Sequence, residues 1–99
     1  MQMPAQTIVS EINAHMAKSG LPNAKWYVGI TSSIDDRLFG FHQVPRKNHW
    51  YIFREAMSEQ DARAIEAAYL NSGCKGGPGG GDAGSVFVYA YAVTPNTVE

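Results

Sequence analysis

The stretch that decides the fold is WYVGIT, residues 26–31, followed by SSIDDRLFGFH, residues 32–42. The first part is rich in aromatic and β-branched residues and predicts a strand. The second part begins with a Ser-x-x-Asp cap and continues as an apolar-periodic helix with acidic residues in its first turn. Tyr27 on the strand and Arg37 on the helix could therefore face one cleft, and we take them as a candidate site.

The remaining local patterns predict two more helices and a second strand. Residues 4–19 carry apolar side chains at three- and four-residue steps, which is typical of an amphipathic helix that ends at Gly20. Ser58 opens another Ser-x-x-Asp cap, and residues 58–72 predict the helix that follows it. Residues 48–54 predict a strand.

The last predicted strand, residues 86–93, is apolar on both of its alternating sides. A strand of this kind is covered on both faces or lies in the middle of its sheet. We therefore expect a small α+β domain covering residues 1–99. Three strands, near residues 25–31, 48–54 and 85–94, should form one antiparallel sheet with the last strand in the middle, flanked by three helices.

Composition narrows the classes of function. The chain has 99 residues and a formal net charge of -1, which gives no general attraction to phosphate backbones and counts against a protein that simply coats DNA. The single cysteine, Cys74, cannot form an intramolecular disulfide. No hydrophobic run is long enough to span a bilayer, and the N-terminus lacks a signal-peptide pattern. These features predict a soluble, cytoplasmic protein without a membrane partner.

Glu66 is the second chemically suggestive residue. A helical wheel places it at the border of the buried face of the helix predicted over residues 58–72. A carboxylate in that position is costly unless it is paired or bound to a metal. The two alternatives are a divalent cation and an ion pair with Arg37, Arg54 or Lys25.

The only dense basic stretch lies in the loop before the strand at residues 48–54. It contains His42, Arg46, Lys47 and His49. Cations beside Trp50 and Tyr51 suit phosphate contact and base stacking. The alternative is an ordinary solvated loop.

A glycine-rich run, residues 74–84, holds most of the glycines. Its backbone amides could cradle a phosphate, with Lys75 adding charge, although a flexible connector is the default interpretation. The pattern of a Walker loop is absent.

The Tyr-x-Gly sequence at residues 27–29, followed ten positions after the tyrosine by Arg37, resembles the second half of the GIY-YIG nuclease domain. The resemblance covers residues 26–70. It implies that Tyr27 orients or deprotonates an attacking water and that Arg37 neutralises charge on the phosphate. It also implies that Glu66 holds Mg²⁺ or Mn²⁺.

The first strand of that family, Gly-Ile-Tyr, should lie just before Tyr-x-Gly, where this chain predicts a helix. Residues 84–89 resemble such a strand moved to the C-terminus, as a circular permutation would place it. The glycine-rich run would carry the chain back across the domain. Tyr89 or Tyr91 would then stand near Tyr27 as the second tyrosine of the site.

The resemblance implies a metal-dependent phosphodiester hydrolase that acts on DNA or RNA in the manner of an endonuclease. The alternative is a non-catalytic binding module, for instance of phage or mobile-element origin, that occupies the surface of a protein partner. The near-neutral charge favours the binding module. So does the position of His42, because the family often has a tyrosine or histidine at the place that Phe41 occupies here, one residue before His42. A different small-molecule or RNA-related role is the third alternative.

Overall fold

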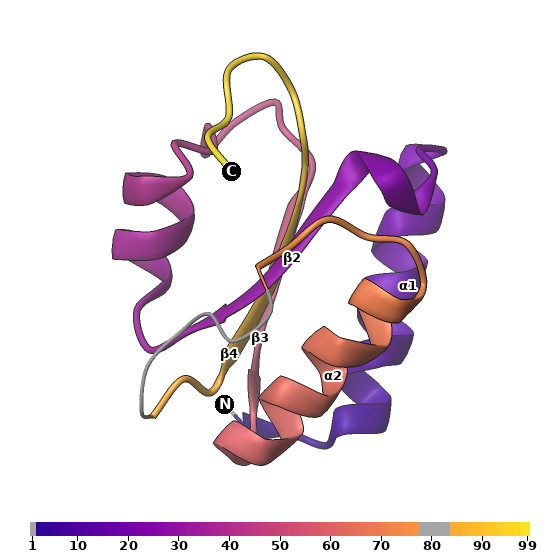
Figure 1. The fold of residues 1–99 in the computed structure, drawn as a ribbon, viewed down its shortest axis with the longest axis vertical. Coiled ribbons are helices and arrows are strands. Elements are labelled where there is room, and N and C mark those ends of the chain that lie inside the picture. The colour runs from indigo at the N-terminus through magenta and orange to yellow at the C-terminus, as the bar shows by residue number, and fades with distance from the viewer. Residues whose placement is uncertain (1, 78–83) are drawn as a thin grey trace.

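The computed structural model describes residues 2–77 and 84–99. The elements in chain order are β1 (Gln2–Met3), α1 (Ala5–Ser19), η1 (Asn23–Lys25), β2 (Trp26–Thr31), η2 (Asp35–Phe41), β3 (Tyr51–Ala56), α2 (Glu59–Asn71) and β4 (Phe87–Ala92). The helices α1 and α2 cover one face of the sheet, and η2 covers the other (Figure 1). The expected α+β class is confirmed.

The sheet has the strand order β1-β3-β4-β2. β4 is antiparallel to β2 on one side and to β3 on the other, so the last strand lies in the middle of the sheet as its two apolar sides suggest. The three predicted strands thus pair as expected, but the sheet is four-stranded and mixed, because Gln2 and Met3 add a strand that runs parallel to β3. Two residues are too few to show the alternation by which a strand is recognised in a sequence.

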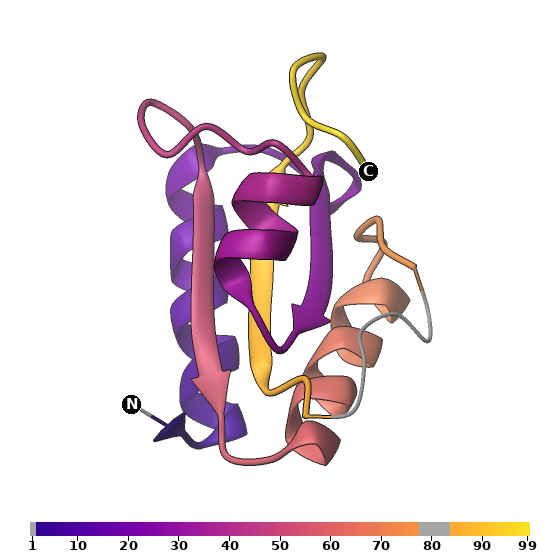
Figure 2. The ribbon, with the colours of Figure 1, turned by 90° about the vertical axis from the view of Figure 1, so that its left-hand side faces the viewer.

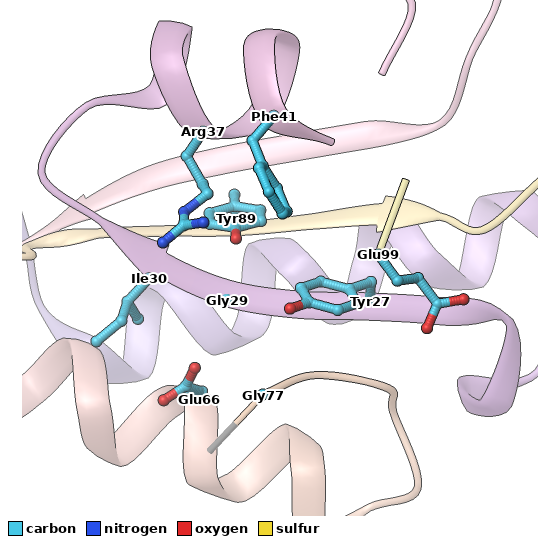
Figure 3. Close-up of a pocket in the computed structure, with 9 residues that line it drawn as sticks. All are labelled: Tyr27, Gly29, Ile30, Arg37, Phe41, Glu66, Gly77, Tyr89 and Glu99. Carbon is cyan, nitrogen blue, oxygen red and sulfur yellow. The ribbon is translucent and has the colours of Figure 1, made fainter. Parts of the chain in front are cut away.

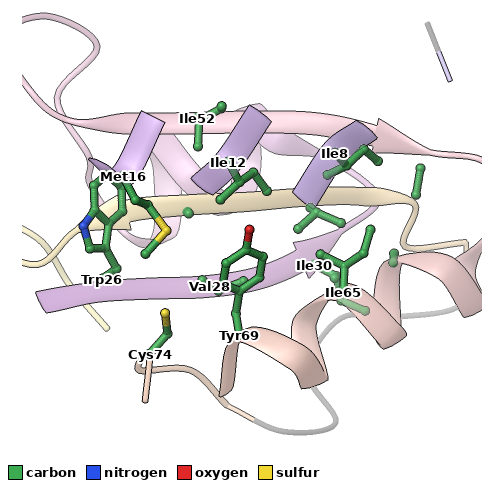
Figure 4. Packing of buried hydrophobic residues seen from close by; sticks show 14 residues of the cluster. Ile8, Ile12, Met16, Trp26, Val28, Ile30, Ile52, Ile65, Tyr69 and Cys74 are labelled. Atoms are coloured by element: carbon green, nitrogen blue, oxygen red, sulfur yellow. The ribbon is translucent and has the colours of Figure 1, made fainter. Parts of the chain in front are cut away.

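The two sides of β4 belong to two hydrophobic clusters. Val88 and Ala90 pack with α1 and α2 in the larger cluster, which Figure 4 shows around Ile12. Tyr89 and Tyr91 point to the opposite face and pack beneath η2. A strand covered from both sides is therefore apolar at every position.

The helix η2 is a π-helix rather than the α-helix that the sequence pattern predicts. Its backbone closes wide turns, in which the N–H of His42 donates to the carbonyl of Arg37, five residues earlier, at 2.9 Å. Figure 2 shows η2 lying across the open face of the sheet. In such a turn the fifth residue after Arg37 takes the place that the fourth residue has in an α-helix.

The helix α2 agrees with its predicted start. The hydroxyl of Ser58 accepts a hydrogen bond from the backbone N–H of Asp61 at 3.1 Å, which is the expected N-cap. The helix ends at Asn71, two residues before Gly73, whose φ of 101° suits glycine. None of the helices in the described ranges has the length and apolar character needed to cross a bilayer.

The start of the glycine-rich run lies along the outer edge of β2. The N–H of Lys75 donates to the carbonyl of Trp26 at 2.8 Å, and the carbonyl of Lys75 accepts from the N–H of Val28 at 2.9 Å. This short parallel pairing brings the chain from α2 alongside the first half of β2. The rest of the predicted phosphate cradle, residues 78–83, lies outside the described residues.

Candidate functional site

A cavity of about 220 Å³ opens at the edge of the sheet beside β2. Tyr27 on β2, Arg37 on η2 and Glu66 on α2 all line it, and Tyr89 on β4 joins them (Figure 3). Three residues singled out by the sequence thus share one pocket with one of the two candidate second tyrosines. The pocket is lined from both faces of the sheet, by Arg37 of η2 on one face and by Glu66 of α2 on the other.

Glu66 is buried without a bonding partner. Its side chain is 5 % exposed, and among the described residues no hydrogen bond or ion pair reaches its carboxylate. Burial raises the pKa of this carboxyl, and the charge of Arg63 lowers it only in part. The expected alternative of a structural ion pair is therefore absent here, and Arg54 pairs instead with Glu11 at 2.6 Å.

Arg37 is likewise unpaired within the part of the chain that the structure describes. Its guanidinium lies 5.1 Å from the centre of the Phe41 ring and points into the pocket (Figure 3). Among the described residues it forms no ion pair with Asp36 or with any other carboxylate. An unpaired cation and an unpaired buried anion therefore line the same cavity without contacting each other, which leaves both free to bind a ligand of opposite charge.

Gly29 explains how Tyr89 reaches the pocket. The two residues are directly opposite in the β2 and β4 pairing. A Cβ at Gly29 would lie 2.4 Å from the hydroxyl oxygen of Tyr89, so the ring occupies the space that any other side chain at this position would need. Tyr91, the other candidate, is fully buried and does not line the pocket.

We expect Gly29→Ala to lower the free energy of unfolding by about 2 kcal/mol, because the added methyl group forces the Tyr89 ring out of its packed position. Chemical denaturation measures this difference. Gly77→Ala is the matched control, since its Cβ would meet nothing closer than the Tyr27 hydroxyl oxygen at 3.8 Å. Equal effects of the two substitutions would contradict the steric explanation.

His42 lies inside the protein, not in a solvated loop, and is 1 % exposed. Its Nδ1 lies 2.6 Å from the carbonyl oxygen of Val98, and its Nε2 lies 2.8 Å from the hydroxyl oxygen of Tyr89. Because a carbonyl can only accept, Nδ1 carries the hydrogen. Burial lowers the pKa of His42, which favours the neutral ring. Nε2 then accepts the hydroxyl hydrogen of Tyr89, and the lone pairs of Tyr89 remain for the pocket.

The hydroxyl of Tyr27 can donate a hydrogen bond to the pocket, whereas the hydroxyl of Tyr89 can accept one. Gly77 lies near the hydroxyl oxygen of Tyr27, and the Gly77 backbone N–H lowers the pKa of Tyr27. Among the described residues no acceptor takes the hydroxyl hydrogen of Tyr27, so this hydrogen can be donated to a ligand. Burial raises the pKa of Tyr27, while Arg37 and the Gly77 amide lower it in part. Tyr27 is therefore a neutral hydrogen-bond donor at pH 7, and Tyr89 is an acceptor beside it.

The other predicted substrate-binding residues are not brought to this pocket. Arg46 pairs with Asp35 at 3.2 Å, and Nε2 of His49 donates to the carbonyl of Ala92 at 2.8 Å. Lys47 and Lys75 are exposed and do not line the cavity. The cationic residues of the basic loop therefore do not form one binding site, and Arg46 and His49 contact separate partners.

Phe41 and Glu99 line the pocket although the sequence patterns did not single them out for the site. Phe41 reads from the sequence as part of the apolar stripe of its helix, yet half of its side chain is exposed. Glu99 arrives because the N–H of Val98 donates to the carbonyl of His42 at 2.8 Å. That return of the chain is a tertiary contact with no local signal in the sequence.

Comparison with protein-family models, with curated proteins and with solved structures finds no match to this chain. Within the described residues, no cluster of three or more histidine, cysteine, aspartate or glutamate side chains could hold a metal ion. Glu66 and Glu99 are the carboxylates among the described residues that line the pocket, and a cation beside Glu66 would take its further ligands from water.

Proposed function

We propose that this chain is a metal-dependent phosphodiester hydrolase that cleaves nucleic acid, built on a circularly permuted GIY-YIG-like domain. The observation that carries the proposal is the pocket in which Arg37 and Glu66, both unpaired among the described residues, face the same space as Tyr27 and Tyr89. A phosphodiester would pair its negative charge with Arg37, and a divalent cation would pair its positive charge with Glu66.

The donor set fits Mg²⁺ or Mn²⁺. Mg²⁺ is commonly bound through one or two carboxylates and keeps several waters, and Glu66 is a buried carboxylate without another partner in the described chain. The bound ion would supply positive charge to the transferring phosphate. Arg37, which has no competing carboxylate, would bind the phosphate oxygens and neutralise the charge that grows in the transition state.

The two tyrosines have different parts in this proposal. Tyr89 presents lone pairs to an attacking water and takes a proton from it, while its own proton passes to Nε2 of His42. Such a transfer avoids a free tyrosinate, which the raised pKa of Tyr89 disfavours. The water oxygen bonds to phosphorus, the bond from phosphorus to the leaving oxygen breaks, and the leaving oxygen takes a proton from solvent. Tyr27 donates a hydrogen bond to the substrate and orients it. The geometry thus favours the water-activating role for Tyr89 over the same role for Tyr27.

Two features of the fold support the family resemblance. β4, which carries Tyr89, lies beside β2, which carries Tyr27, as the permutation requires. The π-helical turn also offsets the extra residue between Arg37 and His42, since the N–H of His42 bonds to the carbonyl of Arg37. His42 therefore occupies the place one helical turn after the arginine.

The alternative, a non-catalytic binding module, is favoured by the charge of the chain. The net charge is -1, and Arg46 is neutralised by Asp35 at the surface. A protein that keeps a pocket but has little attraction for nucleic acid could use the same surface for a protein partner.

Cleavage of DNA and RNA by the purified chain distinguishes the two functions. We expect slow cleavage with Mg²⁺ or Mn²⁺, none with a chelator, and a loss of about 10²-fold in both Tyr27→Phe and Tyr89→Phe, where only a hydroxyl group is removed. Tyr51→Phe is the control, because its hydroxyl donates to the carbonyl of Arg46 outside the pocket. Absence of cleavage with any metal, together with co-purification of a protein partner, would favour the binding module.

A further inference from the structure

Most of the arginine side chains form an ion pair with a carboxylate. Three of the four donate to a carboxylate: Arg46 to Asp35 at 3.2 Å, Arg54 to Glu11 at 2.6 Å and Arg63 to Glu59 at 2.7 Å. Only Arg37 lacks such a partner in the described chain. The four lysines are exposed at separate places, and none lines the pocket.

This distribution gives the substrate few phosphate contacts. Proteins that bind duplex DNA through its backbone neutralise several phosphates at once, and their affinity falls steeply with salt. Here the pocket offers the single guanidinium of Arg37, while Glu99 adds a carboxylate at the same place. Recognition of a nucleic acid must therefore depend on one phosphate and on contacts of another kind.

Phe41 provides a contact of another kind. Its ring is half exposed at the pocket and lies 5.1 Å from the guanidinium of Arg37. It also meets the buried ring of His42 edge to face, with the ring centroids 5.1 Å apart. An exposed aromatic ring beside a phosphate-binding arginine suits a nucleobase next to the bound phosphate. In a duplex that base is already stacked and paired, so the ring favours an unpaired one.

We propose that the pocket binds single-stranded or locally unpaired nucleic acid, holding one phosphate at Arg37 and stacking the adjacent base on Phe41. The inference rests on the proposed function for the identity of the ligand, but it concerns binding and is tested without cleavage. It names the strand state of the substrate, which the family resemblance does not.

The test measures binding of a fluorescent oligothymidine and of a duplex of equal length by anisotropy, in the Glu66→Gln background with a chelator. This background removes the buried charge, so that binding requires no metal. We expect the single strand to bind at least about tenfold more tightly than the duplex, with a log-log salt slope near -0.7, as one neutralised phosphate predicts.

Substitution of Phe41 then tests the stacking contact. Adding Phe41→Leu should weaken binding of the single strand about tenfold. Phe53→Leu is the matched control, because this ring is 38 % exposed on β3 and does not line the pocket. Equal or tighter binding of the duplex, no binding of either strand form, or no effect of Phe41→Leu would overturn the inference.

The outcomes also separate this inference from the proposed function. If no metal supports cleavage but the preference for single strands depends on Phe41, the hydrolase proposal fails and the binding inference holds. If the wild-type chain cuts duplex and single strands equally well, the hydrolase proposal holds and the inference on strand state fails.

Discussion

Arg37→Ala is expected to reduce cleavage about 10³-fold while the melting temperature changes by no more than about 3 °C. The loss is expected to be large because, in the proposed mechanism, the guanidinium acts on charge that develops in the transition state. The stability hardly changes because Arg37 has no ion pair within the described chain, so its removal leaves no buried carboxylate alone. Steady-state kinetics and thermal unfolding of the same preparation measure both quantities.

Arg46→Ala is the control for Arg37. Its partner Asp35 is mostly exposed, and a surface pair of this kind contributes little to stability. We expect activity and melting temperature close to wild type. A fall of about 3 kcal/mol in the stability of Arg37→Ala would instead identify Arg37 as one half of a structural ion pair.

Glu66→Gln is expected to abolish cleavage and at the same time to raise the free energy of unfolding by about 1 kcal/mol at pH 7. Burial raises the pKa of the Glu66 carboxyl above its ordinary value of 4.5, so that the ionised form is less favourable in the folded protein than in the unfolded chain. The contribution of Glu66 to stability is therefore fully present below pH 4.5 and is lost as the pH rises through the raised pKa.

Urea unfolding at pH 4 and at pH 7 measures this dependence. The gain in Glu66→Gln should be present at pH 7 and nearly absent at pH 4. Glu59→Gln is the control, because Glu59 pairs with Arg63 at 2.7 Å and its substitution should give no gain at either pH. A loss of stability in Glu66→Gln at pH 7 would mean that the carboxylate has a structural partner in solution.

The helices and strands were predictable where local patterns dominate. Gly20 ends α1 as expected, with a φ of 72°, and the Ser58 cap opens α2. The two apolar sides of β4 also predicted its position in the middle of the sheet, because a strand buried on both faces has no polar positions. These features depend on residues close together in the sequence.

The features that were missed depend on distant contacts. β1 is too short to show a pattern, and it exists because Gln2 and Met3 meet the end of β3. In the π-helical form of η2, His42 lies one turn after Arg37. In an α-helix that place would belong to Phe41, one residue earlier. No propensity of the individual residues distinguishes these two forms.

The candidate site was also predictable only in part, because some of its residues depend on distant contacts. The spacing of Tyr27 and Arg37 suggested that these two residues face one cleft, and both line the cavity. The wheel position of Glu66 indicated only the border of the buried face, and the structure brings this residue to the same cavity. The basic loop failed as a guide because the partners of Arg46 and His49 are Asp35 and Ala92, which are chosen by the fold. Charge in a sequence shows where cations are, but not which of them remain unpaired.

The most direct test of the central claim is cleavage of a single-stranded oligonucleotide by wild-type protein and by Glu66→Gln, each with Mg²⁺, with Mn²⁺ and with a chelator. We predict products only where both the ion and the Glu66 carboxylate are present, because that buried carboxylate has no other partner in the described chain. Equal cleavage by Glu66→Gln, or no cleavage by wild-type protein with either ion, would contradict the assignment of this pocket as a phosphodiester hydrolase site.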